Sequence, residues 1–122
     1  MAGHRVLLVE DNALNQELAT DLLGDVGLQP ELAANGAEAV AAVQRKRYDL
    51  ILMDVQMPVI DGLEATRRVR LLPGYEETPI LATTASAFEE DRKRCLEAGM
   101  DDFVAKPIDP ALLRGALARW LP

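Results

Sequence analysis

The chain has 122 residues, a length that fits one globular domain with a hydrophobic core of its own. Hydrophobic residues make up 49% and charged residues 27% of the sequence, and no apolar run approaches the roughly 18 residues that a membrane-spanning helix needs. The formal net charge of −7 has the wrong sign for binding the nucleic-acid backbone and favours cations or basic partners instead.

The N-terminus and the cysteine content indicate the compartment. Residues 1–5 contain no apolar stretch of a signal peptide, and they lead directly into the apolar run at 6–9. Cys95 is the only cysteine, which excludes an internal disulfide and is compatible with a reducing environment. We therefore expect a cytoplasmic protein that does not insert into a membrane.

Short apolar runs alternate with longer helical patterns through the whole chain. The predicted strands are, in order, 6–9, 29–33, 50–53, 80–83 and 103–105. The predicted helices follow them at about 14–26, 39–43, 61–70, 88–98 and 110–121. Because parallel strands need crossover connections, this alternation predicts a mostly parallel sheet with helices on both faces. We expect one α/β domain over residues 1–122.

Three of the predicted helices carry local signals. The first has an apolar residue at every fourth position, at Leu14, Leu18, Leu22 and Val26. The third begins after Asp61, a predicted N-cap with Glu64 three residues later. The last has a predicted packing stripe of Leu112, Leu113, Leu117 and Trp120.

Polar side chains stand at the ends of four of the five predicted strands. They are Glu10 and Asp11 after the first strand, Asp54 after the third, Thr84 after the fourth and Lys106 after the fifth. In open α/β sheets, ligands bind outside the carboxyl ends of the strands, so we expect these side chains to converge at one edge of the sheet. The sequence therefore predicts a functional site there.

The mixture of residue types indicates the chemistry of this site. Three carboxylates placed together repel one another unless a cation lies among them, and Mg²⁺ is commonly held by one or two carboxylates plus phosphate oxygens. An aspartate can also accept a phosphoryl group and form an acyl phosphate. A metal ion and the ammonium of Lys106 would neutralise charge on that group. We therefore predict phosphoryl chemistry with Mg²⁺.

Four segments together resemble the receiver domain of two-component response regulators. They are "LLVEDN", "DLILMDVQMPVIDG", "PILATTAS" and "DDFVAKPI", and they span essentially the whole chain. The resemblance implies a flavodoxin-like, doubly wound sheet with five parallel strands in the order 2-1-3-4-5 and five helices. The segments "EDNALNQ" and "MDVQMPVIDGLEATRRVR" are most similar to receivers attached to hybrid histidine kinases.

The resemblance also implies the roles of the residues at the strand ends. Asp54 would be the phosphoacceptor, and Lys106 would contact the phosphoryl oxygens. Asp11, Asp54 and the main-chain carbonyl of Gln56 would ligate Mg²⁺ directly, while Glu10 would act through water. A domain of this kind catalyses its own phosphorylation and dephosphorylation.

Other positions would couple and tune the reaction. Thr84 would follow the phosphoryl group and couple it to rotation of the aromatic side chain of Phe103. Gln56 and Ser86, two residues beyond Asp54 and Thr84 respectively, occupy positions that set the lifetime of the acyl phosphate.

The implied partner is a phosphohistidine on a histidine kinase or on a histidine phosphotransfer domain. We expect it to dock where the first helix begins, near Asn12, Asn15 and Leu18. The protein would be a monomer or weak dimer that binds no nucleic acid. It would act as a separate phosphorelay protein or as a cytoplasmic part of a membrane-bound sensor kinase.

Several alternatives remain open at this stage. Asp11 or Asn12 could only cap the first helix, and Thr83 competes with Thr84. A phosphatase of the haloacid-dehalogenase type needs a second aspartate where this chain has Gln56, and an FMN carrier needs a phosphate loop where it has acids. A phosphorylation-independent pseudo-receiver is harder to separate, although such domains usually lose one of the acids or the lysine.

Overall fold

The computed structural model describes residues 3–57, 60–85 and 89–121. Within them, one sheet contains β1 (Val6–Val9), β2 (Glu31–Ala33), β3 (Leu50–Asp54), β4 (Ile80–Thr84) and β5 (Asp102–Ala105). Neighbouring strands are parallel throughout, and their order is β2-β1-β3-β4-β5. This confirms the predicted fold class and the strand order that the resemblance implied.

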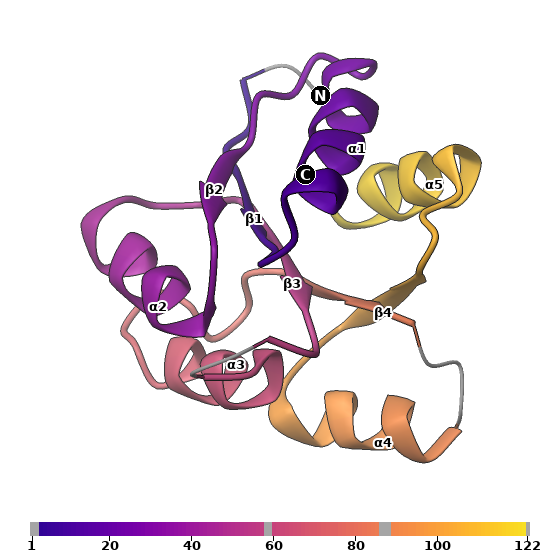
Figure 1. The fold of residues 1–122 in the computed structure, drawn as a ribbon. Coiled ribbons are helices and arrows are strands. Elements are labelled where there is room, and N and C mark those ends of the chain that lie inside the picture. Colours follow the sequence, from indigo (N-terminus) through magenta and orange to yellow (C-terminus); the bar gives the residue numbers. More distant parts are fainter. Residues whose placement is uncertain (1–2, 58–59, 86–88, 122) are drawn as a thin grey trace.

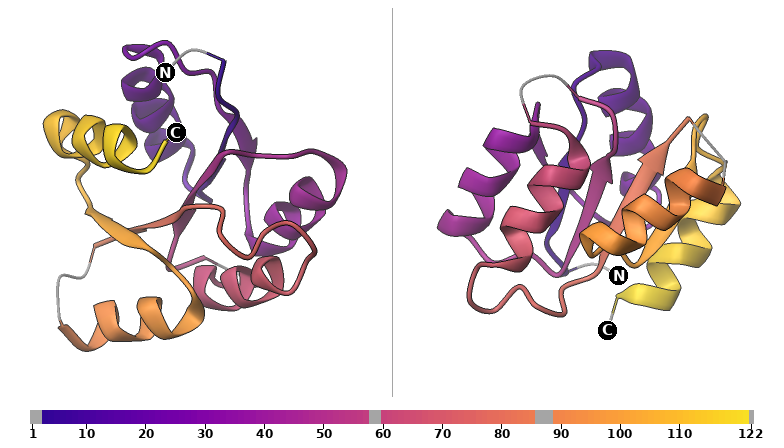
Figure 2. Two further views of the ribbon diagram at one scale, coloured as in Figure 1. Left: turned by 180° about the vertical axis from the view of Figure 1, so that it is seen from behind. Right: turned by 90° about the horizontal axis from the view of Figure 1, so that it is seen from below.

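Helices connect the strands and cover both faces of the sheet (Figure 1). They are α1 (Ala13–Gly24), α2 (Gly36–Arg45), α3 (Gly62–Arg70), α4 (Glu89–Ala98) and α5 (Pro110–Trp120). The views in Figures 1 and 2 show α1 and α5 on one face and α2, α3 and α4 on the other. In the part of the chain described, no helix is long and apolar enough to cross a membrane.

The two faces of the sheet bury two separate hydrophobic clusters. Leu7 and Ile51 belong to the cluster under α2, α3 and α4, whereas their neighbours Leu8 and Leu52 belong to the cluster under α1 and α5. Because helices cover both faces, β1 and β3 contain continuous apolar runs instead of alternating apolar and polar residues. This two-sided burial fixes the sheet and leaves its carboxyl edge for the site.

Polar side chains begin the helices at that edge. Asp61 accepts a hydrogen bond from the Glu64 amide at 2.9 Å, which confirms the predicted N-cap of α3. Asn12 caps α1 in the same way, with its side-chain oxygen 3.0 Å from the Asn15 amide. Of the two candidates for this cap, the structure assigns it to Asn12, and Asp11 lies in the acidic cluster described below.

The structure corrects the predicted packing stripe of α5 and shows which residues of α1 face the core. Leu14 and Leu18 are 63% and 52% exposed, and the buried residues of α1 are Ala19 and Leu23. A spacing of four residues drifts by about 40° per step on a helix of 3.6 residues per turn, so a stripe can begin in solvent and wind towards the core. In α5, Leu113 and Leu117 are buried, but Leu112 is 64% exposed and does not belong to the packing stripe.

Candidate functional site

The carboxyl edge of the sheet brings the predicted site residues together. Ligand atoms of Glu10, Asp11 and Asp54 all lie within 4.8 Å of one another. Lys106 Nζ reaches into this cluster, at 2.7 Å from Glu10 Oε1 and 3.1 Å from Asp54 Oδ1. The backbone amide of Lys106 donates to the Thr84 carbonyl at 2.8 Å, so Thr84 lies beside Lys106 at the same edge. The expected convergence is confirmed.

Asp54 is the last residue of β3 and is only 3% exposed. The chain turns sharply after it, and the amide of Gln56 donates to Asp54 Oδ1 at 3.3 Å. At the start of α3, Gly62 packs directly on this turn, where an added Cβ would lie 2.1 Å from the Asp54 carbonyl oxygen. Any larger residue at 62 would therefore displace the backbone that carries Asp54.

Glu10 is held from three directions. Its carboxylate accepts hydrogen bonds from Lys106 and, at 3.1 Å, from the Asn12 amide. The side-chain amide of Gln16 donates to the Glu10 carbonyl oxygen at 2.7 Å. No local pattern predicts this role of Gln16, because it depends on how α1 lies over the end of β1. Asp11, the next residue, is exposed, so the cluster has one solvent-exposed carboxylate and two buried ones, those of Glu10 and Asp54.

Burial and the neighbouring polar groups shift the pKa values of Asp54 and Glu10. Burial raises the pKa of Asp54 to about 7, and a hydrogen bond shared with Glu10 adds to this rise, while Lys106 opposes it. Burial also opposes ionisation of Glu10, but hydrogen bonds from Lys106, Asp54 and the Asn12 amide outweigh it and lower the pKa of Glu10. One lysine thus serves two buried carboxylates.

The same logic applies to Lys106. Burial disfavours its ammonium form, but the hydrogen bonds to Glu10 and Asp54 outweigh this effect and raise the pKa of Lys106. The lysine therefore stays charged at neutral pH. A cluster of three carboxylates and one cation still carries excess negative charge, and carboxylate oxygens are the hard ligands that Mg²⁺ prefers. The residues present fit such an ion.

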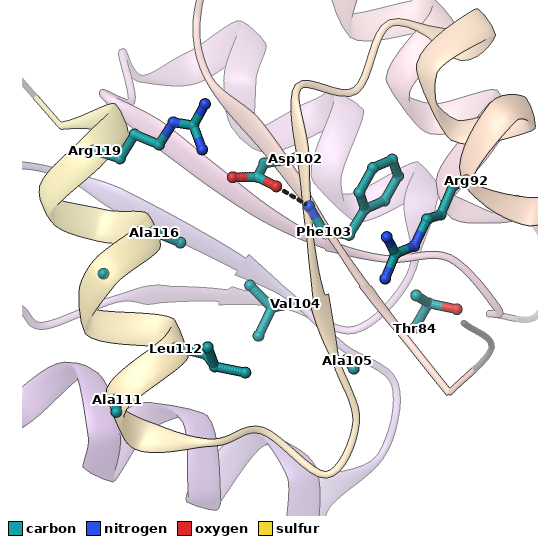
Figure 3. Close-up of a pocket in the computed structure, with 11 residues that line it drawn as sticks. Thr84, Arg92, Asp102, Phe103, Val104, Ala105, Ala111, Leu112, Ala116 and Arg119 are labelled. Atoms are coloured by element: carbon teal, nitrogen blue, oxygen red, sulfur yellow. Dashed lines mark hydrogen bonds between the residues drawn. The ribbon is translucent and has the colours of Figure 1, made fainter. Parts of the chain in front are cut away.

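The predicted switch residues, Thr84 and Phe103, lie beside a cavity between β5, α4 and α5 (Figure 3). Thr84 and Phe103 both line it, whereas Thr83 does not, which supports the choice of Thr84. Phe103 is half-buried and packs against the cluster under α2, α3 and α4. The guanidinium carbon of Arg92 lies 5.4 Å from the centre of its ring. Sequence reasoning missed Arg92, since only the folded chain brings it to Phe103.

The remaining predicted residues have mixed outcomes. Asn15 and Leu18 line a largely apolar groove of about 290 Å³ that also contacts Glu10 and Lys106. The peptide bond between Lys106 and Pro107, which also lines this groove, is cis. Gln56 is exposed, and its role as a main-chain ligand stays a prediction. Ser86, the second tuning residue, lies outside the described residues.

The comparisons with known proteins agree with this site. The response regulator receiver domain family matches residues 6–118 of the chain. Hybrid signal transduction histidine kinase G of Dictyostelium discoideum is 42% identical over 121 residues, which cover 97% of this chain and 4% of that protein. The chain therefore spans only a small part of the length of such curated relatives.

Solved structures that are similar over nearly the whole chain include one with a bound ion and one with a bound partner. The receiver domain of sensor histidine kinase PA1611 from Pseudomonas aeruginosa has a TM-score of 0.91 and 46% identity, with 98% of each chain covered, and holds a magnesium ion in its active site cleft. A chain in the co-crystal structure of the Saccharomyces cerevisiae histidine phosphotransfer protein Ypd1 with the receiver domain of Ssk1 has a TM-score of 0.89 and 31% identity, covering 96% of this chain and 88% of that one.

The residues that match the family include all five strands and the acidic cluster of Glu10, Asp11 and Asp54. The relatives above are receivers or proteins that contain them, and the fold has the strand order expected of this class. The chain belongs to the response regulator receiver domain family, whose members act in two-component and phosphorelay signalling.

Proposed function

We propose that this receiver takes a phosphoryl group from a phosphohistidine onto Asp54, with Mg²⁺ bound, and that the product changes a partner surface. The position of Asp54 carries the proposal. It is a buried carboxylate at the end of a strand, with Lys106 at 3.1 Å and the ligand atoms of Glu10 and Asp11 within 4.8 Å. A purely structural aspartate would be better balanced by its neighbours, because an uncompensated buried charge is costly.

The reaction forms one bond and breaks another. A carboxylate oxygen of Asp54 attacks phosphorus, the P–N bond to the donor histidine breaks, and the imidazole nitrogen keeps the bonding electrons. The ammonium of Lys106 then stabilises negative charge on the transferred oxygens. Attack of water on the same phosphorus, with loss of inorganic phosphate, returns the Asp54 carboxylate.

The metal would be held by Asp11, Asp54 and the main-chain carbonyl of Gln56, with Glu10 acting through water. A bound Mg²⁺ supplies positive charge next to the phosphoryl oxygens. Gln16 and Asn12 would fix the turn between β1 and α1, because their hydrogen bonds hold Glu10 in place.

The donor would dock over the start of α1. Leu18 is 52% exposed beside an apolar groove that also contains Pro107 and Ile108 and that reaches Lys106. A few apolar side chains within a polar rim suit a specific but transient contact. The complex of Ypd1 with the Ssk1 receiver supports a histidine phosphotransfer protein as the partner, since that receiver has the same fold. We place Asn12 at the rim and Asn15 and Leu18 in the contact.

Thr84 and Phe103 would transmit the change, and Gln56 and Ser86 would tune the lifetime of the acyl phosphate. We also propose that the chain is the receiver of a hybrid kinase, works in the cytoplasm and is a monomer or weak dimer. The similarity to hybrid kinase G supports the first of these points. A phosphorylation-independent pseudo-receiver is the alternative that an experiment has to separate. An aspartate-nucleophile phosphatase is weaker, because Gln56 stands where a second aspartate is needed.

Intact mass after incubation with acetyl phosphate tests the reaction. We expect the gain of one phosphoryl group in the presence of Mg²⁺ and none in excess chelator. Asp54→Asn should abolish the gain. Asp61→Asn is a matched control from the same turn, since asparagine also caps helices and α3 should stay intact. Equal labelling of the wild type and Asp54→Asn would rule out this acceptor, and an unlabelled wild type would favour the pseudo-receiver.

A second experiment tests the docking surface. Asn15→Arg should slow transfer from a phosphorylated histidine phosphotransfer domain about tenfold, while labelling by acetyl phosphate stays nearly unchanged. Asp25→Arg at the distal end of α1 is the control. If both donors slow equally, Asn15 belongs to the chemistry or the fold; if neither slows, the partner docks elsewhere.

A further inference from the structure

The cavity between β5, α4 and α5 joins the phosphorylation edge to the last helix. It has a volume of about 380 Å³, and its lining includes Thr84 from β4, Arg92 from α4, Phe103 from β5 and Leu112 from α5 (Figure 3). Thr84 comes from the strand end beside Lys106, with its carbonyl 2.8 Å from the Lys106 amide. A change at Asp54 can therefore reach this cavity through adjacent backbone.

Phe103 is held in this cavity differently from the other aromatic side chains that contact an arginine. The hydroxyl of Tyr75 donates to the Lys46 carbonyl at 2.8 Å, and the indole N–H of Trp120 donates to Asp102 at 2.8 Å. Phenylalanine has no polar atom on its ring. The orientation of Phe103 therefore depends on packing and on Arg92, whose guanidinium carbon lies 5.4 Å from the ring centre, within the reach of a cation–π interaction.

Arg92 stands on the more weakly attached half of α4. The buried residues of this helix are Cys95 and Ala98, both in its second half, and none of the residues 89–94 is buried. A segment with few buried contacts has low local stability. The contact between Arg92 and Phe103 thus ties a lightly held half-helix to a central residue of β5.

In the structure, the contact between Arg92 and Phe103 is present while Asp54 is unphosphorylated, with its Oδ1 3.1 Å from Lys106 Nζ. Phosphorylation would give Lys106 a new partner and disturb Thr84 beside it. An interaction shifts an equilibrium between two states only if it is stronger in one of them. We propose that Arg92 is a positioning residue that holds the ring of Phe103 in the unphosphorylated state and so opposes the change that phosphorylation favours. This inference rests on the function proposed above.

The test measures how tightly the site binds beryllium fluoride, a tetrahedral phosphoryl analogue, in the presence of Mg²⁺. Trp120 is the only tryptophan of the sequence, and its indole N–H donates a hydrogen bond to Asp102. The other carboxylate oxygen of Asp102 accepts a hydrogen bond from the Phe103 amide at 2.8 Å. The fluorescence of Trp120 therefore reports on β5 next to Phe103. We expect Arg92→Ala to tighten the apparent affinity about two- to fivefold, the range that one exposed cation–π contact corresponds to. Arg92→Lys should fall between this variant and the wild type.

Two controls decide whether Arg92 acts through the ring. Lys93→Ala removes a positive charge from the next, exposed position of α4 and should leave the affinity unchanged. In a Phe103→Leu background, Arg92→Ala should have no effect. The inference is wrong if Arg92→Ala does not alter the affinity, if Lys93→Ala has the same effect, or if the effect persists without the ring. A wild type that binds no beryllium fluoride would contradict the proposed function itself and remove the basis of this inference.

Discussion

Two clusters of charged side chains lie at opposite ends of the sheet, and their charges are balanced in opposite ways. At the carboxyl edge, Lys106 is shared between Glu10 and Asp54, and the exposed Asp11 adds a further negative charge. At the amino ends of β4 and β5, Arg70 meets a single carboxylate, Asp101, at 2.8 Å. The first cluster has excess charge, whereas the second is balanced.

Hydrogen bonding widens the difference. Arg70 donates to the carbonyl oxygens of Gly99, Tyr75 and Thr78 as well as to Asp101, at distances of 2.7 to 3.0 Å. These bonds tie the end of α3 to the segments that lead into β4 and β5. A fully paired guanidinium stabilises the fold, while an unbalanced acidic group binds a cation or changes its protonation state. Balance of charge thus separates the structural cluster from the functional one.

The largest expected effect is loss of the balanced cluster. Arg70→Ala leaves the half-buried Asp101 without its cation and several carbonyl groups without a donor, so we expect the free energy of unfolding to fall by about 3 kcal/mol. Urea unfolding measures this. Arg68→Ala is the control on the same helix, because its pair with Glu64 is about half exposed and should contribute less than about 1 kcal/mol. Equal losses in the two variants would contradict the comparison.

Replacement of aspartate by asparagine should change the free energy of unfolding in opposite directions in the two clusters. Asp54→Asn removes an unbalanced buried charge, so we expect the metal-free protein to gain about 1 to 2 kcal/mol at pH 8. Asp101→Asn weakens the bonds from Arg70 and from the Ile80 amide, and should cost about 1 kcal/mol. Urea unfolding of both variants without metal checks this; destabilisation by Asp54→Asn would show that the carboxyl edge is balanced after all.

The two clusters also differ in how far the sequence predicted them. The acidic edge followed from a rule of α/β sheets: polar residues directly after buried strands meet at one edge. The sequence predicts Arg70 only as the last residue of a helix at 61–70, because its partners lie 5 to 31 residues further along the chain. The same reason explains why Arg92 and Gln16 were missed. Contacts of this kind depend on how helices lie on the sheet, which local pattern does not encode.

Burial within a helix was also harder to predict than its presence. The strands are flanked on both faces, so every apolar residue in β1 is buried whatever its register. A surface helix must instead choose one side. The leucines of α1 and α5 predict helices correctly, but Leu14, Leu18 and Leu112 face solvent, while Ala19, Leu23, Leu113 and Leu117 face the core.

Mg²⁺ should stabilise the unbalanced cluster. At a Mg²⁺ concentration about ten times the dissociation constant, mass action adds about 1.4 kcal/mol to the free energy of unfolding and raises the melting temperature by a few degrees. Asp11→Ala should remove most of this response, since it deletes one carboxylate of the cluster. Asp101→Asn, in the balanced cluster, should keep the response. The same Mg²⁺-induced shift in the wild type and in Asp11→Ala would exclude the proposed metal site.

The smallest expected effect is the pH dependence of that stabilisation. Burial and the hydrogen bond with Glu10 raise the pKa of Asp54 to about 7, so its carboxyl is largely protonated at pH 6 and ionised at pH 8. In the metal-free protein, a raised pKa means that ionisation costs stability, which is lost as the pH rises from the unfolded-state value near 4 through 7.

A metal ion needs the ionised form of Asp54 and competes with the proton. The Mg²⁺ affinity should therefore fall up to about tenfold from pH 8 to pH 6, and the stabilisation at a fixed Mg²⁺ concentration by about 1 kcal/mol. Thermal scans over this pH range measure the effect. Because the pH dependence is expected from the cluster around Asp54, urea unfolding of Arg70→Ala relative to the wild type should show nearly the same loss at both pH values. A Mg²⁺ response independent of pH would mean that Asp54 is ionised throughout and that Lys106 balances its charge better than its position indicates.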